Sequence, residues 1–198
     1  MNPKNIFLYA SISIVLIISY NKWTDRPITH RPGIIAPKIP IQQNITNIEP
    51  FDYKEFKITP LAKFSIEARV LSRKRYYFGR AAKLVPVDLA LGWGPMSDES
   101  ILKSIKISQS NRFYFWFVKK FPIPKQEIIT HSSNMHLIPA NSEIRSKIKK
   151  ARKGSLVKFS GYLVKATCDD GWHWNSSLKR DDVGNGACEL VWVDEFEL

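Results

Sequence analysis

The chain has little of what most catalytic and metal-binding sites are built from. It contains two cysteines and four histidines in 198 residues. Two cysteines exclude a dense disulfide scaffold and a four-cysteine zinc module. The sequence also lacks a Gly-x-Ser-x-Gly elbow, a His-Glu-x-x-His pair and a glycine-rich phosphate loop. We therefore predict no cofactor and no metal site, and the sequence favours a protein that is not an enzyme.

Acidic residues are also scarce. Lys and Arg outnumber Asp and Glu by 30 to 18, which gives a formal net charge of +12. Residues 60–165 hold 21 basic and six acidic residues, whereas residues 166–198 hold two and eight. This distribution is typical of an anion-binding face, although a basic solvated surface is the simpler interpretation. Hydrophobic residues make up 44% of the chain, which excludes a wholly disordered protein.

One hydrophobic run dominates the N-terminus. Residues 6–20 read IFLYASISIVLIISY, without charge or proline. A membrane-spanning helix needs roughly 20 residues, which residues 1–24 supply. Residues 17–21 lack the small-residue pattern of a cleavage site, so we predict an uncleaved transmembrane signal anchor over residues 1–24 rather than a signal peptide. A buried core helix is the remaining alternative.

This anchor predicts a single-pass membrane protein, which contacts the membrane through residues 6–20. Lys22, Arg26 and Arg31 follow the run and favour a cytoplasmic body. A signal anchor with a short N-terminal tail normally exports the domain that follows it. We therefore expect a periplasmic or extracytoplasmic body.

Prolines concentrate just after the anchor. Residues 25–60 hold six of the twelve prolines, which predicts an extended, semi-rigid linker. The alternative is that this stretch wraps along the domain, since it also contains many isoleucines. A β-rich globular domain is then expected over residues 61–198.

Residue patterns within 61–198 predict a fold of class α+β, mainly β. We expect strands over 64–70, 112–118, 155–166 and 189–196, an exposed turn at 73–75 and a return strand at 76–78. Gly161 marks a bend. Two short helices should begin near Ser97 and at Asn141 or Ser142. The sum is a small, strongly bent sheet or barrel with two short helices, preceded by the transmembrane helix.

Cys168 and Cys188 enclose a polar loop of about 20 residues, and each lies beside an expected strand. A disulfide across that span would contribute about 3 kcal/mol, mainly by constraining the unfolded chain. Two unpaired thiols are the alternative. A zinc site that includes His173 lacks a fourth ligand, and a calcium loop that begins at Asp181 fails at its third position.

The remaining candidate site residues are a polar segment and one carboxylate. Residues 131–136, HSSNMH, are flanked by apolar pairs, so we expect a fixed, partly buried loop. Asn134 and at least one histidine should bond to backbone or to a carboxylate such as Asp88. Asp88 itself lies in an apolar run and needs a partner, for which Arg112 and Arg80 are candidates.

Three functional interpretations follow. The first is a membrane-anchored exported domain with a binding or structural role in the cell envelope and no catalysis. Its partners would be anionic lipid, an envelope polymer or another envelope protein, with nucleic acid disfavoured. Its binding surface would comprise Trp93, His131, Asn134, His136, Trp172 and Trp174.

The second interpretation is a hydrolase. It would use Asp88 with His131 or His136, and the nucleophile would be Ser132, Ser133 or Ser177. The third is an anion- or nucleic-acid-binding module on the basic face, suggested by the aromatic and basic residues of 112–116. Convergence of Asp88, a histidine and a serine in one pocket would favour the enzyme.

Three stretches also carry a resemblance. They are DLALGWGPMSD at residues 88–98, HSSNMH at 131–136 and GACE at 186–189. Together they resemble a family of uncharacterised bacterial membrane-anchored proteins, over roughly residues 60–195. The resemblance implies an envelope location, as a single-pass protein of the bacterial inner membrane, and carries no known activity.

Overall fold

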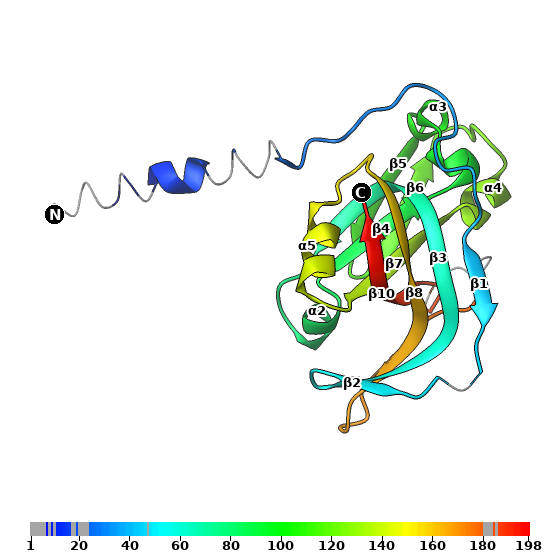
Figure 1. The fold of residues 1–198 in the computed structure, drawn as a ribbon. Helices are drawn as coiled ribbons and strands as arrows, with labels where there is room; N and C mark the ends of the chain where they lie inside the picture. Colours follow the sequence, from blue (N-terminus) through cyan, green and yellow to red (C-terminus); the bar gives the residue numbers. More distant parts are fainter. Residues whose placement is uncertain are drawn as a thin grey trace.

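The computed structural model describes residues 24–46, 48–179, 184 and 186–198, together with residues 7, 9, 11–16 and 19 of the N-terminal segment. A β-rich body contains the strands and the described short helices that follow residue 24, and the N-terminal segment projects from it (Figure 1). The fold is α+β and mainly β, as predicted.

A closed ring of five strands forms the centre of the body. In spatial order they are β3 (Phe56–Arg75), β4 (Val87–Gly92), β7 (Ser132–Pro139), β10 (Glu189–Glu197) and β8 (Leu156–Thr167). Pairing of β8 with β3 closes the ring. Neighbouring strands are antiparallel except for β7 and β10, which are parallel.

The connectivity of this ring is specific. Numbered along the chain, the spatial order is first, second, third, fifth, fourth and back to first. Helix α5 (Ser142–Lys150) connects the third strand to the fourth. A five-stranded Greek-key barrel with this order and a helix at this place has the topology of an OB-fold.

Two long, bent strands make so small a ring possible. β3 has 20 residues and β8 has 12, and their register shifts between Pro60 and Ala62. The register of β10 against β8 shifts between Val193 and Glu195, next to Gly161. A Cβ atom on Gly161 would lie 1.9 Å from the carbonyl oxygen of Trp192, so only glycine allows this close approach. The predicted bend at Gly161 is confirmed.

Alternate residues of the ring strands fill the barrel interior. β3 contributes Phe64 and Ile66, and β4 contributes Val87, Leu89 and Leu91. The period of two follows from the pleat, which directs successive side chains to opposite faces. α5 adds Ile144 and Ile148 to the same core. Its N-terminus is capped as predicted, because the Asn141 side chain accepts a hydrogen bond from the Ile144 N–H at 2.9 Å.

The other elements cover the outside of the ring. They are α2 (Arg80–Leu84), the 3-10 helix η1 (Gly94–Ser97), α3 (Glu99–Leu102), α4 (Lys125–Thr130), β9 (His173–Asn175) and a separate hairpin of β5 (Ile105–Ser110) and β6 (Phe113–Val118). α3 is the helix predicted near Ser97, with Asp98 as its N-cap. Three helices beyond the two predicted are therefore present among the described residues.

Three local predictions were wrong. Residues 73–75 continue β3 because they pair with β4, so the expected turn is absent there. Residues 76–78 form a loop before α2 instead of a return strand. Residues 132–136 belong to β7, where the cross-strand pairs with β4 replace the expected loop.

The proline-rich stretch follows the surface of the body. The Ile28 N–H donates to the Lys153 carbonyl and the Gly94 N–H to the Ala36 carbonyl, each at 2.8 Å. β1 (Ile41–Asn44) and β2 (Phe51–Tyr53) then pair with β3. The wrapping alternative therefore describes this stretch, and the boundary placed between residues 60 and 61 lies inside β3.

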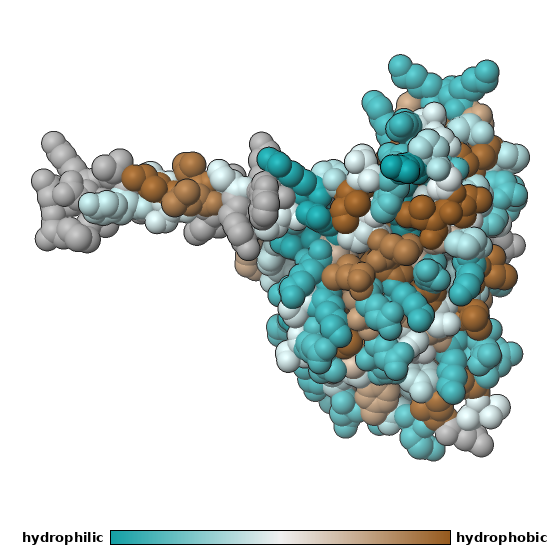
Figure 2. Space-filling model, turned by 45° about the horizontal axis from the view of Figure 1, so that its top comes forward, coloured by the Kyte–Doolittle hydropathy of each residue, from teal (hydrophilic) through white to brown (hydrophobic). Residues whose placement is uncertain are grey.

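The predicted anchor at residues 6–20 lies partly outside the described residues, which in this run are 7, 9, 11–16 and 19. Six of these carry exposed apolar side chains: Phe7, Tyr9, Ile12, Ile14, Val15 and Leu16. Figure 2 shows hydrophobic side chains on the projecting segment and hydrophilic ones where it meets the body. Within the described part of the chain, no helix has the length and apolar character needed to cross a membrane.

Gly161 offers a test of the barrel. We expect Gly161→Ala to lower the free energy of unfolding by about 3 kcal/mol, because the new methyl group would displace the backbone of β10. Gly171→Ala is the matched control. Its Cβ would meet open space, so only the positive φ of 84° opposes it, at about 1 kcal/mol. Urea unfolding of both variants measures the difference, and equal losses would contradict the close approach.

Candidate functional site

The sequence-predicted polar residues meet on the outer face of β4 and β7. Val87, Leu89 and Leu91 of β4 point into the barrel, so the residues between them point outward. Asp88 lies opposite His136, and Ala90 lies opposite Asn134. The β5–β6 hairpin folds over this face, and its residues close the cluster from outside.

Asp88 is the centre of the cluster and is fully buried. Arg112 Nη1 donates to Asp88 Oδ1 at 2.7 Å, and Arg112 Nη2 donates to the Val85 carbonyl at 3.0 Å. The guanidinium also stacks on the Tyr76 ring, 3.5 Å from its centroid. Burial, together with the Asp88 carboxylate, raises the pKa of Tyr76 above its ordinary value. Of the two arginines considered from the sequence, Arg112 is the partner of Asp88.

The hairpin turn explains how Arg112 reaches this position. Asn111 and Arg112 have φ angles of 49° and 69°, and they are the two residues between β5 and β6. Two positive φ angles in a two-residue loop are the hallmark of a type I′ turn, whose twist matches that of the paired strands. The tight turn therefore directs the arginine from the hairpin tip into the barrel face.

His136 lies beside the ion pair. Its Nδ1 atom is 3.0 Å from Asp88 Oδ1, and its ring lies 4.6 Å from the ring of Trp174. The approach is not directed as a hydrogen bond, and among the described residues neither His136 Nδ1 nor Asp88 Oδ2 has a hydrogen-bond partner. With Arg112 as counter-ion, the carboxylate is held as part of the packing between hairpin and barrel.

Asn134 provides a second set of hydrogen bonds between the hairpin and the barrel. Its side-chain amide donates to the Arg112 carbonyl at 2.9 Å, and its oxygen accepts from Gln109 Nε2 at 2.6 Å. The side chain is 2% exposed. The expectation that Asn134 bonds to backbone is confirmed. The hydrogen bond expected of a histidine is made by His131, whose Nδ1 atom lies 3.1 Å from the Glu127 carbonyl oxygen, whereas His136 only lies beside Asp88.

The serines do not complete a hydrolase site. Ser132 donates to the Ile128 carbonyl at 2.6 Å and accepts from the Tyr114 hydroxyl at 3.1 Å. Ser133 donates to Glu189, and Ser177 donates to the Lys179 carbonyl. In the part of the chain that the structure describes, no serine hydroxyl forms a hydrogen bond with His136 or Asp88.

His131 lies outside the cluster. Its Nδ1 atom is 3.1 Å from Glu127 Oε2, and its ring contacts Gly94, where an added Cβ would approach it to 2.6 Å. Asp88 and His136 are therefore together, whereas His131 and Ser132 have other partners. The arrangement lacks the chain of nucleophile, base and orienting acid that acyl transfer needs.

The six residues predicted to form a binding surface are dispersed. Trp93 is 2% exposed and belongs to the barrel core. Trp172 and Trp174 are half-buried and pack edge to face, with centroids 6.3 Å apart. Asn134 and His136 lie beneath the hairpin. The tryptophans thus pack against the body, and the set does not form one solvent-facing surface.

Cys168 and Cys188 are not bonded to each other, contrary to the predicted disulfide. β9 explains this outcome. It pairs with β8 at Lys165–Thr167, whereas β10 pairs with β8 only as far as Leu163. β9 therefore separates the two cysteines. The Cys188 thiol lies against Asn134 and the Arg112 carbonyl, and burial raises the pKa of the Cys168 thiol.

Metal sites find no support in the described residues, which contain no group of three or more His, Cys, Asp or Glu side chains arranged to hold an ion. The Asp181 and Asn185 positions of the candidate calcium loop lie outside those residues.

A surface that includes part of the aromatic segment 112–116 lies beside the cluster. Side chains of β6 alternate: Tyr114 and Trp116 pack toward the barrel, while Phe113, Phe115 and Phe117 are exposed. A cleft of about 770 Å³ runs between this hairpin, α3 and the end of β3. Four cations and one carboxylate line it: Arg69, Lys103, Lys106, Lys153 and Glu99.

The floor of this cleft is a buried ion pair. Arg69 donates to Glu99, and this bond holds the pKa of Glu99 below its ordinary value. Lys103, Lys106 and Lys153 remain as exposed or half-exposed cations. Residues 113–117 are all aromatic, and a strand that packs one face against the barrel exposes its other face to solvent. The sequence of this segment therefore indicated that some of its aromatic side chains would be exposed.

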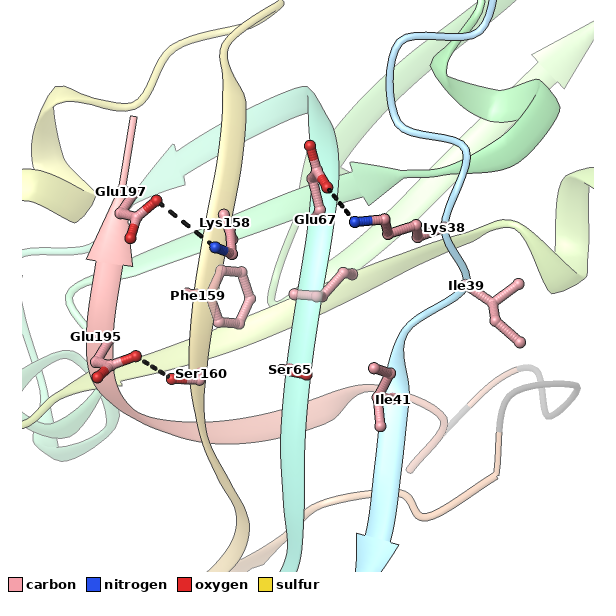
Figure 3. A pocket seen from close by; sticks show the side chains of 11 residues that line it. Lys38, Ile39, Ile41, Ser65, Glu67, Lys158, Phe159, Ser160, Glu195 and Glu197 are labelled. Atoms are coloured by element: carbon pink, nitrogen blue, oxygen red, sulfur yellow. Dashed lines mark hydrogen bonds and ion pairs between the residues drawn. The ribbon is translucent and has the colours of Figure 1, made fainter.

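A smaller cleft of about 190 Å³ lies on the opposite strands of the barrel (Figure 3). Its charged groups pair within it: Glu67 with Lys38 and Glu197 with Lys158, each at 4.0 Å. Ser160 donates to Glu195 at 2.8 Å. None of the sequence-predicted site residues lines this cleft.

Removing the central carboxylate tests whether the cluster is structural. We expect Asp88→Ala to lower the free energy of unfolding by about 3 kcal/mol, because it leaves Arg112 largely buried without a counter-ion. Asp170→Ala, which breaks the exposed pair with Arg80, should leave stability close to that of the unchanged protein. Chemical denaturation measures both, and a neutral Asp88→Ala variant would exclude the structural role.

Tyr114 predicts a pH dependence. Burial raises the pKa of Tyr114 to about 12, above the ordinary value of about 10 for a tyrosine. The unfolded chain therefore releases this proton at a lower pH than the folded protein, and stability should fall as the pH rises from about 10 to about 12. Tyr114→Phe should flatten this part of the stability curve, whereas Tyr77→Phe, at an exposed loop residue, should not. Identical slopes for all three proteins would contradict the assignment.

Comparisons of the chain with protein-family models, with characterised proteins and with solved structures find no significant match. The resemblance to membrane-anchored proteins therefore stays a prediction, and function has to be argued from the surfaces described above.

Proposed function

We propose that the protein is a membrane-attached binding module without a catalytic role. It captures an anionic partner on the outward face of the β5–β6 hairpin and in the cleft beneath it. The observation that carries the proposal is the row of exposed phenylalanines at 113, 115 and 117 on a hairpin that is fastened to the barrel. Three neighbouring exposed aromatic rings on a rigid support form a contact surface that folding itself does not require.

Charge defines the partner. The cleft offers four cations against one carboxylate, and the carboxylate is already paired with Arg69. Lys106 lies directly opposite Phe117 in the hairpin register, so one ammonium group shares a surface with the rings, while Ser108 and Ser110 lie opposite the other two phenylalanines. A ligand that fits would carry negative charge together with rings or other apolar groups, as an acidic envelope polymer or an acidic protein segment does.

The barrel topology supports a binding role by analogy. OB-folds bind ligands on the outer face of their second and third strands, which here are β4 and β7. In this protein the β5–β6 hairpin covers that face. The binding surface is thereby moved outward, onto the exposed side of the hairpin. The analogy concerns the fold alone and does not identify a ligand.

Membrane attachment is part of the proposal. The uncharged run at residues 6–20 and the exposed apolar side chains described within it support an anchor in the bacterial inner membrane. An exported body would meet envelope polymers and proteins. The hydrolase alternative loses support because Asp88 is neutralised by Arg112 and the nearby serines bond elsewhere.

Three probes test the binding surface on the full chain. The first is a peptide of alternating Glu and Tyr, the second is polyglutamate of equal charge, and the third is oligothymidylate. We expect the Glu-Tyr peptide to bind more tightly than polyglutamate, because its rings can stack on the phenylalanines. Phe115→Ala combined with Phe117→Ala should weaken that binding at least about tenfold. Fluorescence titration measures each affinity.

Phe78→Ala is the matched control, since Phe78 is 93% exposed but lies in the loop before α2. It should bind as the unchanged protein does. A clear preference for oligothymidylate would favour the nucleic-acid module instead. Failure of all three probes, or equal loss in the Phe78 control, would contradict the proposed surface.

A further inference from the structure

A third cleft, of about 630 Å³, lies where the N-terminal segment joins the body. Its walls come from the first residues of the body, the end of β3, the end of α5 and the start of β8. Five cations line it together with one acidic side chain: Arg73, Arg75, Lys149, Lys150, Arg152 and Asp25. Leu198, which carries the terminal carboxylate of the chain, also lines the cleft, so the cations still outnumber the acidic groups. Ile28 and Leu156 form an apolar side.

The arginines of this cleft are held in place by the end of α5. Arg73 donates to the carbonyls of Lys149 and Ala151, at 3.0 and 2.5 Å. Arg75 donates to the same Lys149 carbonyl at 2.9 Å. Unpaired carbonyls at a helix C-terminus attract cations, which explains why the basic residues gather there.

The positive charge exceeds what the protein itself neutralises. Asp25 lies 2.6 Å from Arg73 and 3.8 Å from Arg75. No carboxylate among the described residues lies within ion-pair distance of Lys149, Lys150 or Arg152. The Nε atom of Arg75 is buried and has no hydrogen-bond partner in the described structure. The cleft is therefore prepared for an anion.

The N-terminal segment fixes where this cleft lies. Arg152 donates to the Thr24 carbonyl at 3.1 Å, so the chain is already attached to the body at residue 24. Only three residues lie between Thr24 and Tyr20, the end of the apolar run, and the four steps along the chain span at most about 14 Å. A body attached so closely to an anchor places the cleft at the level of the lipid headgroups. Figure 2 shows the hydrophilic side chains at this junction.

We propose that this cleft binds the headgroup of an anionic phospholipid, with the phosphate among the basic side chains and the glycerol end against Ile28 and Leu156. The proposal rests on the membrane attachment proposed above. It adds a specific lipid contact that would orient the body on the membrane. Basic residues next to a membrane are attracted to anionic lipid, and a cleft of this volume is large enough for a headgroup.

The test uses the full chain in a neutral detergent. Soluble short-chain phosphatidylglycerol is titrated by calorimetry, beside short-chain phosphatidylcholine and glycerol phosphate. We expect phosphatidylglycerol to bind at least tenfold more tightly than either, because only this lipid combines net negative charge with acyl groups. Lys149→Gln combined with Lys150→Gln should weaken its binding roughly 30-fold, at about fivefold per lysine.

Lys119→Gln combined with Lys120→Gln is the matched control. It removes the same charge from two adjacent exposed lysines in the connection between β6 and α4, and it should leave lipid binding unchanged. Equal binding of phosphatidylcholine, or equal loss in both variants, would overturn the proposal. Binding of glycerol phosphate as tight as that of the lipid would show a phosphate site and would overturn the lipid assignment.

The proposed headgroup site and the proposed membrane anchor are tested by separate measurements. Carbonate extraction of membranes reports whether the full chain is anchored, independently of the cleft. The lipid titration in detergent reports the cleft, independently of the anchor. A chain that remains in carbonate-washed membranes but ignores phosphatidylglycerol would refute only the headgroup site.

Discussion

The pairing of β3 with β8 is the constraint on which the rest of the structure depends. It closes five strands into a ring and gives the apolar residues of every ring strand a shared interior. Closure requires both strands to bend within a few residues, which is why a glycine is needed where β8 approaches the backbone of β10. Without this pairing, β3 and β8 would each present an open edge to solvent.

Closure also determines what happens outside the ring. The outer face of β4 and β7 carries Asp88, Asn134 and His136. Removing these polar side chains from water without giving them hydrogen-bond partners would cost free energy. The β5–β6 hairpin supplies partners for Asp88 and Asn134 through Arg112 and Gln109, and it covers His136. Once the inner side of the hairpin is committed to the barrel, its phenylalanines have only the outward side left. Because the inner face of the hairpin packs against the barrel, its outer face presents the phenylalanines to solvent.

Much of the fold could be read from local patterns. The alternation in 64–70, the aromatic run of 112–118, the glycine at 161 and the cap at Asn141 each report backbone geometry within a few residues, and each prediction was confirmed. The partner of Asp88 was also anticipated, since a carboxylate in an apolar run requires a cation. These inferences succeed because the cause lies close in sequence or is a simple charge balance.

Long-range placement could not be read in the same way. Cys168 and Cys188 each border a strand, but the insertion of β9 beside β8 separates them, and no local signal reports that insertion. Trp93 resembles an exposed turn residue, yet the turn it belongs to packs into the barrel. The prolines of 25–60 indicate extended backbone correctly. They do not indicate whether an extended chain leaves the body or lies along it.

The parallel pairing of β10 with β7 has a consequence for biosynthesis. β10, at residues 189–197, lies between β7 and β8 and is one of the five strands of the ring. The barrel can therefore close only after that strand has left the ribosome, and every earlier length of nascent chain contains an incomplete ring with unpaired edges. Contacts that join distant parts of a chain also form slowly. Exposed apolar surface and unpaired strand edges favour misassociation, so the nascent chain is most exposed to it before β10 pairs with β7 and β8.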